Sequence, residues 1–379
     1  MENAGWIKRY HDERLFMKRR LKIGILGATG MIGQAYVRLL RNHPWFEVAY
    51  LAASERSAGK TYAEAVQGRW HGETDIPENI AKMVVENAQN VESARNHCEL
   101  LFSAVEMDKA SIAALEEHYA ASGIAVVSNN SAHRWTDDVP MIIPEINSDH
   151  LTVIDLQRRN RGWSSGCIVV KSNCSIQSYM TPLYALIHGG YSVEKMFVAT
   201  LQALSGAGYP GPSAFDMIDN VIPLIPGEEE KSENEPLKIL GSLSGNGIVK
   251  AEYPRITAHC NRVPVLHGHT ACVSIGFCEG AVPSIDEMAD VWRNFRGEPQ
   301  LLELPTAPVQ PIHVRDEPSR PQPRIDRDTE SAMAVTVGRL RPCPLLDLRF
   351  VGLHHNTVRG AAGGCILTAE LLTAKGYVG

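Results

Sequence analysis

Residues 21–41 contain the pattern that most constrains how this chain can fold. An apolar, β-rich run (Leu21 to Leu26) ends in Gly27-Ala28-Thr29-Gly30-Met31-Ile32-Gly33, and apolar residues then recur at helical spacing from Gln34 to Arg41. Such glycines let a strand turn tightly into a helix and let the backbone approach a pyrophosphate, whose charge then faces the helix N-terminus. The pattern predicts the first unit of a dinucleotide-binding sheet. Glycine-rich turns also occur where a strand and a helix only pack together, so the prediction of a dinucleotide site needs support from the rest of the chain.

The next elements alternate between strand and helix. Apolar strands are predicted over 46–52, 100–105 and 124–128, with a helix over 108–121 between the last two. This alternation predicts an α/β fold with a Rossmann-type, doubly wound parallel sheet, in which ligands bind at the carboxyl ends of the strands. We assign residues 21–150 to this dinucleotide-binding domain.

The residues after the second strand favour one cofactor. A free ribose hydroxyl is usually bound by Asp or Glu at this point, but the chain reads Ala53-Ser54-Glu55-Arg56-Ser57. Small hydroxyls beside Arg56 suit a 2′-phosphate, so NADP (as NADPH) is favoured over NAD. Two alternatives stay open: Glu55 favours NAD, and the segment can be a solvated polar loop with no role in cofactor binding. The expected cofactor-binding residues are Gly27, Thr29, Gly30, Met31, Ile32, Gly33, Ser54, Arg56, Ser57 and, at a later strand end, Ser103.

The pattern changes near residue 151. Strands become more numerous, which predicts an α+β catalytic and dimerisation domain over 151–356 with a mixed or antiparallel sheet. Its broad sheet face is a natural surface for a homodimer or homotetramer. The C-terminal segment 357–379 is rich in small residues and is expected to pack back on the cofactor domain as a helix.

Composition excludes several classes of partner. A formal charge of -6 gives no electrostatic reason to expect nucleic acid or an anionic membrane, and no run of about 18 apolar residues exists. The eight cysteines lack metal-ligand spacing, which suggests reduced thiols and a cytoplasmic protein that acts on a small molecule. Residues 1–20 lack a signal core and are expected to be an N-terminal extension.

Cys174 is the strongest candidate for a reactive group. It follows an apolar run at a predicted strand-to-helix corner, where free N–H groups and the helix dipole favour a thiolate. A buried, inert cysteine is the common alternative. His-Gly-His-Thr follows downstream, with His267 93 residues and His269 95 residues after Cys174. On a strand the two histidines would face the same side, so spacing alone does not show which of them is the base.

Several separated motifs together resemble one family. They are the glycine loop, Ser-Asn-Cys-Ser at 172–175, Gln202 to Gly208, Pro226 to Leu240, Arg262 to Thr270, and Val314 to Arg324. In this order they resemble aspartate-semialdehyde dehydrogenase of the archaeal and fungal type, from about residue 21 to the C-terminus.

The resemblance implies roles for individual residues. Cys174 would attack an acyl phosphate, L-4-aspartyl phosphate, and release inorganic phosphate, and the resulting thioester would be reduced with NADPH to L-aspartate 4-semialdehyde in amino-acid biosynthesis. His269 would be the base. The other implied residues are Asn173 and Gln202 at the thioester carbonyl, Arg262 at the substrate carboxylate, Glu235 at its amine, Lys238 and Arg134 at the phosphate, and Asn356 at the nicotinamide end of the cofactor.

Two other readings stay open. Malonyl-CoA reductase, a related enzyme, also has His-Gly-His and a similar Asn-Thr-Val-Arg-Gly-Ala-Ala-Gly-Gly tail, and its substrate is a thioester without an amine; other acyl-phosphate reductases are also possible. A non-catalytic dinucleotide-binding sensor is the alternative from another class, but it would not need a nucleophile, a base and three substrate-binding charges together.

Overall fold

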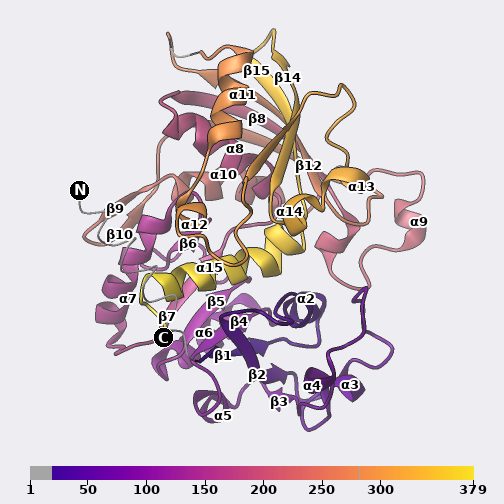
Figure 1. Cartoon of the computed structure of the whole chain (residues 1–379), viewed down its shortest axis with the longest axis vertical. Helices are drawn as coiled ribbons and strands as arrows, with labels where there is room; N and C mark the ends of the chain where they lie inside the picture. The colour runs from indigo at the N-terminus through magenta and orange to yellow at the C-terminus, as the bar shows by residue number, and fades with distance from the viewer. Residues whose placement is uncertain (1–18, 281) are drawn as a thin grey trace.

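The structure is a computed structural model that describes residues 19–280 and 282–379. The expected N-terminal extension, residues 1–20, therefore lies outside the described residues except for its last two. Two sheets organise the described chain, a seven-stranded sheet in the order β3-β2-β1-β4-β5-β7-β6 and a six-stranded sheet in the order β11-β8-β12-β15-β14-β13. Figure 1 shows the first sheet in the lower half of the molecule and the second in the upper half.

The first sheet is parallel throughout. Every recorded strand pair in it is parallel, and the strand order reverses direction at β1, where β2 lies on one side and β4 on the other. The expected Rossmann-type sheet is confirmed. Its strands are β1 (Leu21–Leu26), β2 (Phe46–Ala53), β3 (Glu86–Asn87), β4 (Leu100–Ser103), β5 (Ala125–Ser128), β6 (Met141–Ile142) and β7 (Cys167–Lys171).

The position of β7 differs from the expected domain boundary. This strand pairs with β5 although it lies in the stretch 151–356 that the sequence assigned to the second domain. The first sheet thus continues past residue 150, because residues 167–170 are apolar on both faces and the whole strand is buried like the other central strands. The strand that leads to Cys174 is therefore part of the cofactor-side sheet.

The second sheet is mixed. Strands β8, β12, β15 and β14 pair in antiparallel fashion, while β11 and β13 add to the two edges in parallel. The expected mixed sheet is confirmed. Its strands are β8 (Val193–Gln202), β11 (Arg255–Arg262), β12 (His269–Phe277), β13 (Ile312–Arg315), β14 (Val335–Pro342) and β15 (Leu348–His354), and a separate hairpin joins β9 (Ser242–Ser244) to β10 (Gly247–Val249).

Helices cover both sheets and connect them. The longer ones are α2 (Met31–Leu39), α6 (Lys109–Ala121), α7 (Val153–Arg161), α8 (Gln177–His188), α10 (Glu228–Ile239), α11 (Ile285–Asn294) and α15 (Gly363–Ala374). Short turns of helix are α3 (Tyr62–Ala65), α4 (Glu78–Ala81), α5 (Val91–Arg95), η1 (Ser148–Thr152), η2 (Leu204–Ala207), α9 (Ala214–Met217), α12 (Glu298–Leu301), α13 (Pro323–Asp326), α14 (Thr329–Ala332) and η3 (Val358–Ala362).

The C-terminal helix packs where the sequence suggested. Residues of η3 and α15 share one buried cluster with β1, β2, β4 and β5, and α15 is buried over nearly its whole length. Figure 1 shows this helix, in yellow, crossing between the two halves of the molecule. The last helix of the chain therefore packs on the first sheet, beside the strands that begin the described chain.

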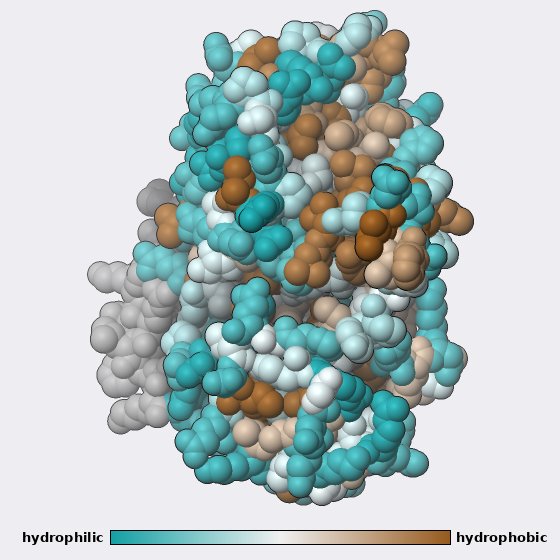
Figure 2. All heavy atoms as spheres, turned by 90° about the vertical axis from the view of Figure 1, so that its right-hand side faces the viewer, coloured by the Kyte–Doolittle hydropathy of each residue, from teal (hydrophilic) through white to brown (hydrophobic). Residues whose placement is uncertain are grey.

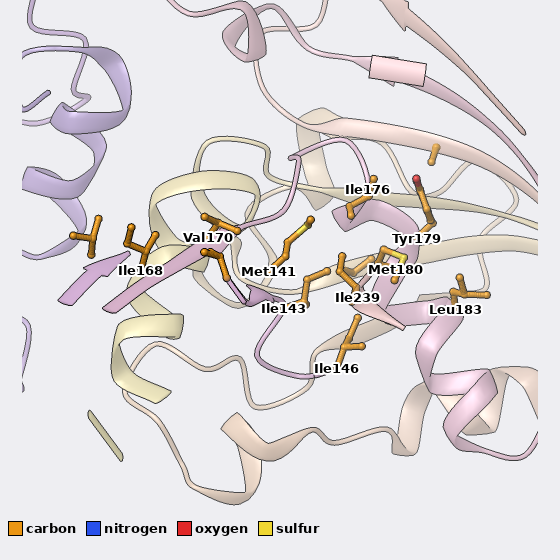
Figure 3. Close-up of a cluster of buried hydrophobic side chains, with 14 of the residues drawn as sticks. Met141, Ile143, Ile146, Ile168, Val170, Ile176, Tyr179, Met180, Leu183 and Ile239 are labelled. Atoms are coloured by element: carbon orange, nitrogen blue, oxygen red, sulfur yellow. The ribbon is translucent and has the colours of Figure 1, made fainter. Parts of the chain in front are cut away.

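The segment that carries Cys174 rests on a continuous core. Val170 at the end of β7 and Ile176 before α8 belong to one cluster with Met141, Met180 and Ile239. Figure 3 shows these side chains together at the junction of β6, β7 and α8. The strand before the cysteine and the helix after it are thus both held by apolar packing, which fixes the turn between them.

The outer surface carries one notable apolar area. Large apolar side chains are exposed on and around α9, among them Phe215, Ile218 and Leu224. Figure 2 views the side of the molecule that carries α9 and shows apolar surface gathered across it. Among the helices of residues 19–280 and 282–379, none is both long and apolar enough to cross a membrane.

Candidate active site

Cys174 lies in the turn that joins β7 to α8. The backbone N–H of Gln177, the first residue of α8, donates to the Cys174 carbonyl at 3.2 Å, so the cysteine precedes the first helical turn. The cysteine is free, and the residue as a whole is partly exposed. The backbone of η3 closes one side, because a Cβ added at Gly360 would come within 3.0 Å of the Cys174 Cβ. The expected strand-to-helix corner is present.

His269 is the histidine that contacts the thiol. It is the first residue of β12 and fully buried, and its Nε2 lies 3.4 Å from the Cys174 Sγ. The backbone N–H of Ala203 donates to its Nδ1 at 3.0 Å. Since a nitrogen that accepts this bond carries no hydrogen, the neutral ring holds its hydrogen on Nε2, where it faces the sulfur.

Burial keeps this pair neutral. Burial, and then the nearby Glu228 carboxylate, raise the pKa of Cys174 to about 11, against opposing positive charges on Lys171, Arg134 and Arg262. Burial, followed by the Arg262 guanidinium, lowers the pKa of His269 to about 3. Burial thus opposes the ionisation of the thiol that the start of a helix favours. Desolvation outweighs the favourable field of the turn.

His267 does not compete for the thiol. Gly268 has a φ of +102°, so the backbone turns sharply between the two histidines and they do not share a strand face. The His267 Nδ1 lies 2.9 Å from the Ser205 hydroxyl, and its ring stacks on His355 with centroids 5.2 Å apart. The prediction that His267 and His269 lie on one strand and face the same side was wrong, because β12 begins only at residue 269.

The Asn356 side chain makes hydrogen bonds to two loops of the second domain. Its Oδ1 accepts from the Gly268 N–H at 2.9 Å, and its Nδ2 donates to the Ser205 Oγ at 2.8 Å. The geometry therefore gives Asn356 a role in holding the loop before His269. One amide hydrogen and one oxygen lone pair remain, so the expected contact with the cofactor stays a prediction.

Glu228, which the sequence did not single out, organises two expected site residues. Its Oε1 accepts from the Asn173 Nδ2 at 2.8 Å and from the Lys231 Nζ at 2.8 Å, and its Oε2 accepts from the Gln202 Nε2 at 3.3 Å. Glu228 is the first residue of α10 and is 7% exposed. The acid-rich start of that helix was visible in the sequence, but only the fold shows which acid faces Asn173 and Gln202.

Arg134 and Glu235 form a buried ion pair beside the same turn. The Arg134 Nη1 donates to the Glu235 Oε1 at 2.8 Å, and the other Glu235 oxygen accepts from the Asn173 backbone N–H at 2.6 Å. Arg134 also donates through Nε to the Lys171 carbonyl at 3.0 Å. Each Glu235 oxygen thus has one partner in the protein, so the carboxylate positions Arg134 and the turn, and its expected contact with an amine stays a prediction.

Lys238 does not reach a phosphate site. Its ammonium donates to three backbone carbonyls, those of Arg134 at 2.8 Å, Thr136 at 2.7 Å and Val139 at 3.0 Å. An ammonium has three hydrogens, so all of them are used within the protein. The phosphate-binding expectation for Lys238 is corrected accordingly: this side chain holds the loop that carries Arg134.

Arg262 has donors to offer an anion. Within the described residues its recorded hydrogen bond is from Nη1 to the Ala203 carbonyl at 2.7 Å, and the side chain ends β11 at the site. A Cβ added at Gly206 would lie 3.0 Å from both the Arg262 Nη1 and the His269 Cε1. Arg262 and His269 therefore line the same space under η2, and the remaining guanidinium N–H groups suit a carboxylate.

The glycine loop fits a dinucleotide. Gly27 has a φ of +76°, and a Cβ there would come within 2.3 Å of the Ala104 carbonyl, so only glycine fits. A Cβ at Gly33 would lie 2.2 Å from the Gly27 carbonyl, which brings α2 close to the turn formed by Thr29 and Gly30. Gly30 caps α2 without a side-chain bond, so the N–H groups of the first turn, from Met31 and Ile32 onward, can meet a phosphate.

The loop after β2 and the end of β4 complete this cofactor region. Arg56 is exposed in the loop after β2, and the Ser57 backbone N–H donates to the Ser54 carbonyl at 2.9 Å in a tight turn. Ser103 is fully buried and its Oγ accepts from the Asn130 Nδ2 at 3.2 Å. In the part of the chain that the structure describes, no three His, Cys, Asp or Glu side chains gather as a metal site.

The buried histidines predict a loss of stability in acid. Burial, then the charges of neighbouring groups, lower the pKa values of His269 and His355 to about 3, whereas the unfolded chain binds their protons near 6.5. Stability from these groups is therefore present above about pH 6.5 and lost as the pH falls toward 3. From about pH 7 to about pH 5 each histidine should cost about 2 kcal/mol of unfolding free energy. Urea unfolding at both pH values measures this, and His355→Gln should remove its share; an unchanged acid loss in that variant would contradict the prediction.

Comparison with known proteins identifies the family. The family model described as semialdehyde dehydrogenase, NAD binding domain, matches residues 22–154, and that described as semialdehyde dehydrogenase, dimerisation domain, matches residues 182–359. The chain is 43% identical over 361 residues to aspartate-semialdehyde dehydrogenase of Schizosaccharomyces pombe, covering 94% of this chain and 99% of the relative. It is 45% identical over 354 residues to the enzyme of that name from Methanothermobacter thermautotrophicus, covering 93% and 99%.

A solved structure agrees with these sequence matches. The crystal structure of aspartate semialdehyde dehydrogenase with NADP from Candida albicans superposes with a TM-score of 0.86 at 39% identity, over 94% of this chain and 99% of that one. The two family-model ranges include Arg262 and His269, and Cys174 lies in the interval 155–181 between them. The chain therefore belongs to the semialdehyde dehydrogenase family.

Proposed function

We propose that the protein is an NADP-dependent aspartate-semialdehyde dehydrogenase that reduces L-4-aspartyl phosphate to L-aspartate 4-semialdehyde and phosphate. The observation that carries the proposal is the 3.4 Å contact between the Cys174 Sγ and the His269 Nε2, beside which Arg262 lies on the other side of Gly206. A nucleophile, a hydrogen-bond donor to it and an anion-binding group are what acyl transfer from a carboxylate substrate needs. The full-length likeness to enzymes of that name in fungi and archaea supports the same substrate.

The residues of the site divide the first step among them. The Cys174 sulfur forms a bond to the acyl carbon, the carbon–oxygen bond to phosphate breaks, and the thiol proton leaves with the phosphate. His269 does not have to act as the base that the resemblance implied, because its Nδ1 is occupied by the Ala203 N–H and its Nε2 hydrogen faces the sulfur. We therefore assign it as the donor that stabilises the sulfur whenever the sulfur is negative.

The second step returns the cysteine. Bound NADPH supplies a hydride to the thioester carbonyl carbon. The carbonyl oxygen becomes negative, and collapse of this adduct breaks the carbon–sulfur bond and frees the aldehyde. Asn173 and Gln202 border this space, oriented by Glu228, and the His269 Nε2–H stabilises the departing thiolate.

Arg262 is proposed to bind the substrate carboxylate, and Arg134 the phosphate. Arg262→Lys should raise the KM for aspartyl phosphate by about 10- to 100-fold, because lysine cannot make two parallel bonds to a carboxylate. The KM for NADPH should change less than about twofold, since Arg262 lies on the second sheet. Steady-state kinetics measure both constants, and an unchanged substrate KM would remove Arg262 from the site.

The protein is also proposed to form a homodimer or homotetramer through the outer face of the second sheet. Phe197 and Leu201 of β8 are 37% and 36% exposed on that face, next to the exposed Cys272 of β12. The match to a family dimerisation domain over residues 182–359 supports an oligomer. Light scattering of wild type and of Phe197→Asp tests it, and a wild-type monomer would contradict it.

Substrate preference provides the test of the function. NADPH oxidation is measured with aspartyl phosphate and, in parallel, with malonyl-CoA, which has a carboxylate but no amine. Turnover with aspartyl phosphate at least about 100-fold faster is expected, because the site matches an acyl phosphate through Arg134 as well as a carboxylate. Faster turnover with malonyl-CoA would identify the protein as a CoA-thioester reductase instead.

A further inference from the structure

Lys171 is a buried cation with few partners directly before the nucleophile. It is the last residue of β7, three positions before Cys174, and it is 3% exposed. Among the described residues its ammonium has one recorded hydrogen bond, to the Ser172 carbonyl at 3.2 Å. An ammonium has three hydrogens to donate, so its hydrogen-bonding capacity is not filled by the protein. A cavity of about 10 Å³, lined in part by Lys171 and Arg359, adjoins it.

The C-terminal segment holds this lysine and the nucleophile from the same side. A Cβ added at Gly364 would lie 2.7 Å from the Lys171 Cε, and one added at Gly360 would lie 3.0 Å from the Cys174 Cβ. Positions four apart on a helical segment share one face. One face of the η3–α15 segment therefore packs against both side chains, and the lysine stem is confined beside the turn.

The other cations nearby already have carboxylate partners. Arg134 pairs with Glu235 at 2.8 Å, and Arg359 pairs with a carboxylate of its own, that of Glu145, also at 2.8 Å. No ion pair is recorded for Lys171 within residues 19–280 and 282–379. A buried charge that no carboxylate balances is costly unless another group supplies a negative charge.

The groups that can supply that charge are thiols. Burial lowers the pKa of Lys171 to about 8, the sulfurs of Cys365 and Cys174 act in the opposite direction, and Arg134 and Arg359 add to the lowering. His354 of β15 also faces this region, but burial keeps its pKa well below the ordinary value, so it is neutral. Cys365 of α15 is fully buried, whereas Cys174 is partly exposed and contacts the His269 donor.

We propose that Lys171 is a positioning residue for the reaction, whose buried ammonium balances the negative charge of the Cys174 thiolate. The thiolate then has two supports, the Nε2–H of His269 and the ammonium of Lys171. This inference rests on the proposed function only in taking Cys174 as the nucleophile. It explains why a charged residue ends an otherwise apolar central strand.

Lys171→Met tests the charge with little change of volume. Alkylation of Cys174 by iodoacetamide at about pH 7, where the Lys171 ammonium is charged, is followed by mass spectrometry of its peptide. The alkylation rate should fall by about tenfold in the variant, because the thiolate loses the nearby positive charge. The kcat/KM at about pH 7 should fall as well, while NADPH affinity stays the same. Lys195→Met, at an exposed lysine of β8, is the control and should leave the alkylation rate unchanged.

Each outcome decides the proposal. Since the methionine replaces an incompletely partnered buried charge, the melting temperature should stay the same or rise. A folded variant with the wild-type alkylation rate would overturn the proposal, and so would failure of the variant to fold, which would make Lys171 a structural residue. Alkylation needs no substrate, so a slower alkylation in a protein that does not turn over aspartyl phosphate would refute the proposed function and leave the role of Lys171 intact.

Discussion

Cys174→Ala is expected to abolish turnover of aspartyl phosphate, with kcat falling by at least about 10⁴-fold. Both steps of the proposed reaction use the sulfur, first as the group that displaces phosphate and then as the leaving group. NADPH affinity should remain, because the glycine loop of residues 27–33 belongs to the first sheet and packs on β4, not on the cysteine turn.

The control for this variant is Cys278→Ser. Cys278 is exposed just beyond β12 and distant in the fold from the β7–α8 turn, so its replacement should leave kcat within about twofold. Steady-state NADPH oxidation and a fluorescence titration with NADPH provide the two measurements. Normal turnover by Cys174→Ala would disprove the covalent mechanism.

His269→Asn is expected to lower kcat by about 10²- to 10⁴-fold, with little change in NADPH affinity. The shorter side chain cannot reach the sulfur with a donor. His269→Gln should keep more activity than His269→Asn, since a glutamine amide can place an N–H near the Nε2 position. A hydrogen-bond donor and a proton-accepting base are thereby distinguished, because neither amide can serve as a base.

His267→Asn is the matched control. Its ring contacts Ser205 and His355 rather than the thiol, so kcat should fall by less than about tenfold. If His267→Asn were as damaging as His269→Asn, or if His269→Asn lost NADPH affinity and thermal stability together with activity, the assignment of His269 to the chemical step would be wrong.

The elements of the fold were predictable where their signals are local. An apolar run followed by glycines marks β1 and α2, and the alternation of strand and helix marks the parallel sheet, because such patterns depend on neighbours along the chain. The boundary at residue 150 was less accurate. β7 joins the first sheet through pairing with β5, a contact between residues far apart in sequence.

The site was predictable only in part for the same reason. Cys174 and His269 come together as the resemblance implied, but the sequence could not show that Gly268 turns the backbone and removes His267 from the thiol. Lys238, an expected phosphate ligand, instead donates to three carbonyls of the 134–139 loop, about a hundred positions away, and holds that loop in place. Glu228 and Lys171 act through such distant contacts too, so their roles became visible only in the fold.

A single-turnover experiment tests the central claim, that Cys174 carries the acyl group, most directly. Enzyme is mixed with L-aspartate 4-semialdehyde and NADP in the absence of phosphate, and NADPH formation is followed together with the mass of the Cys174 peptide. We expect a burst of about one NADPH per active site, acylation of Cys174, and steady turnover when phosphate is added. Steady NADPH formation without phosphate, or a burst with Cys174 unmodified, would contradict it.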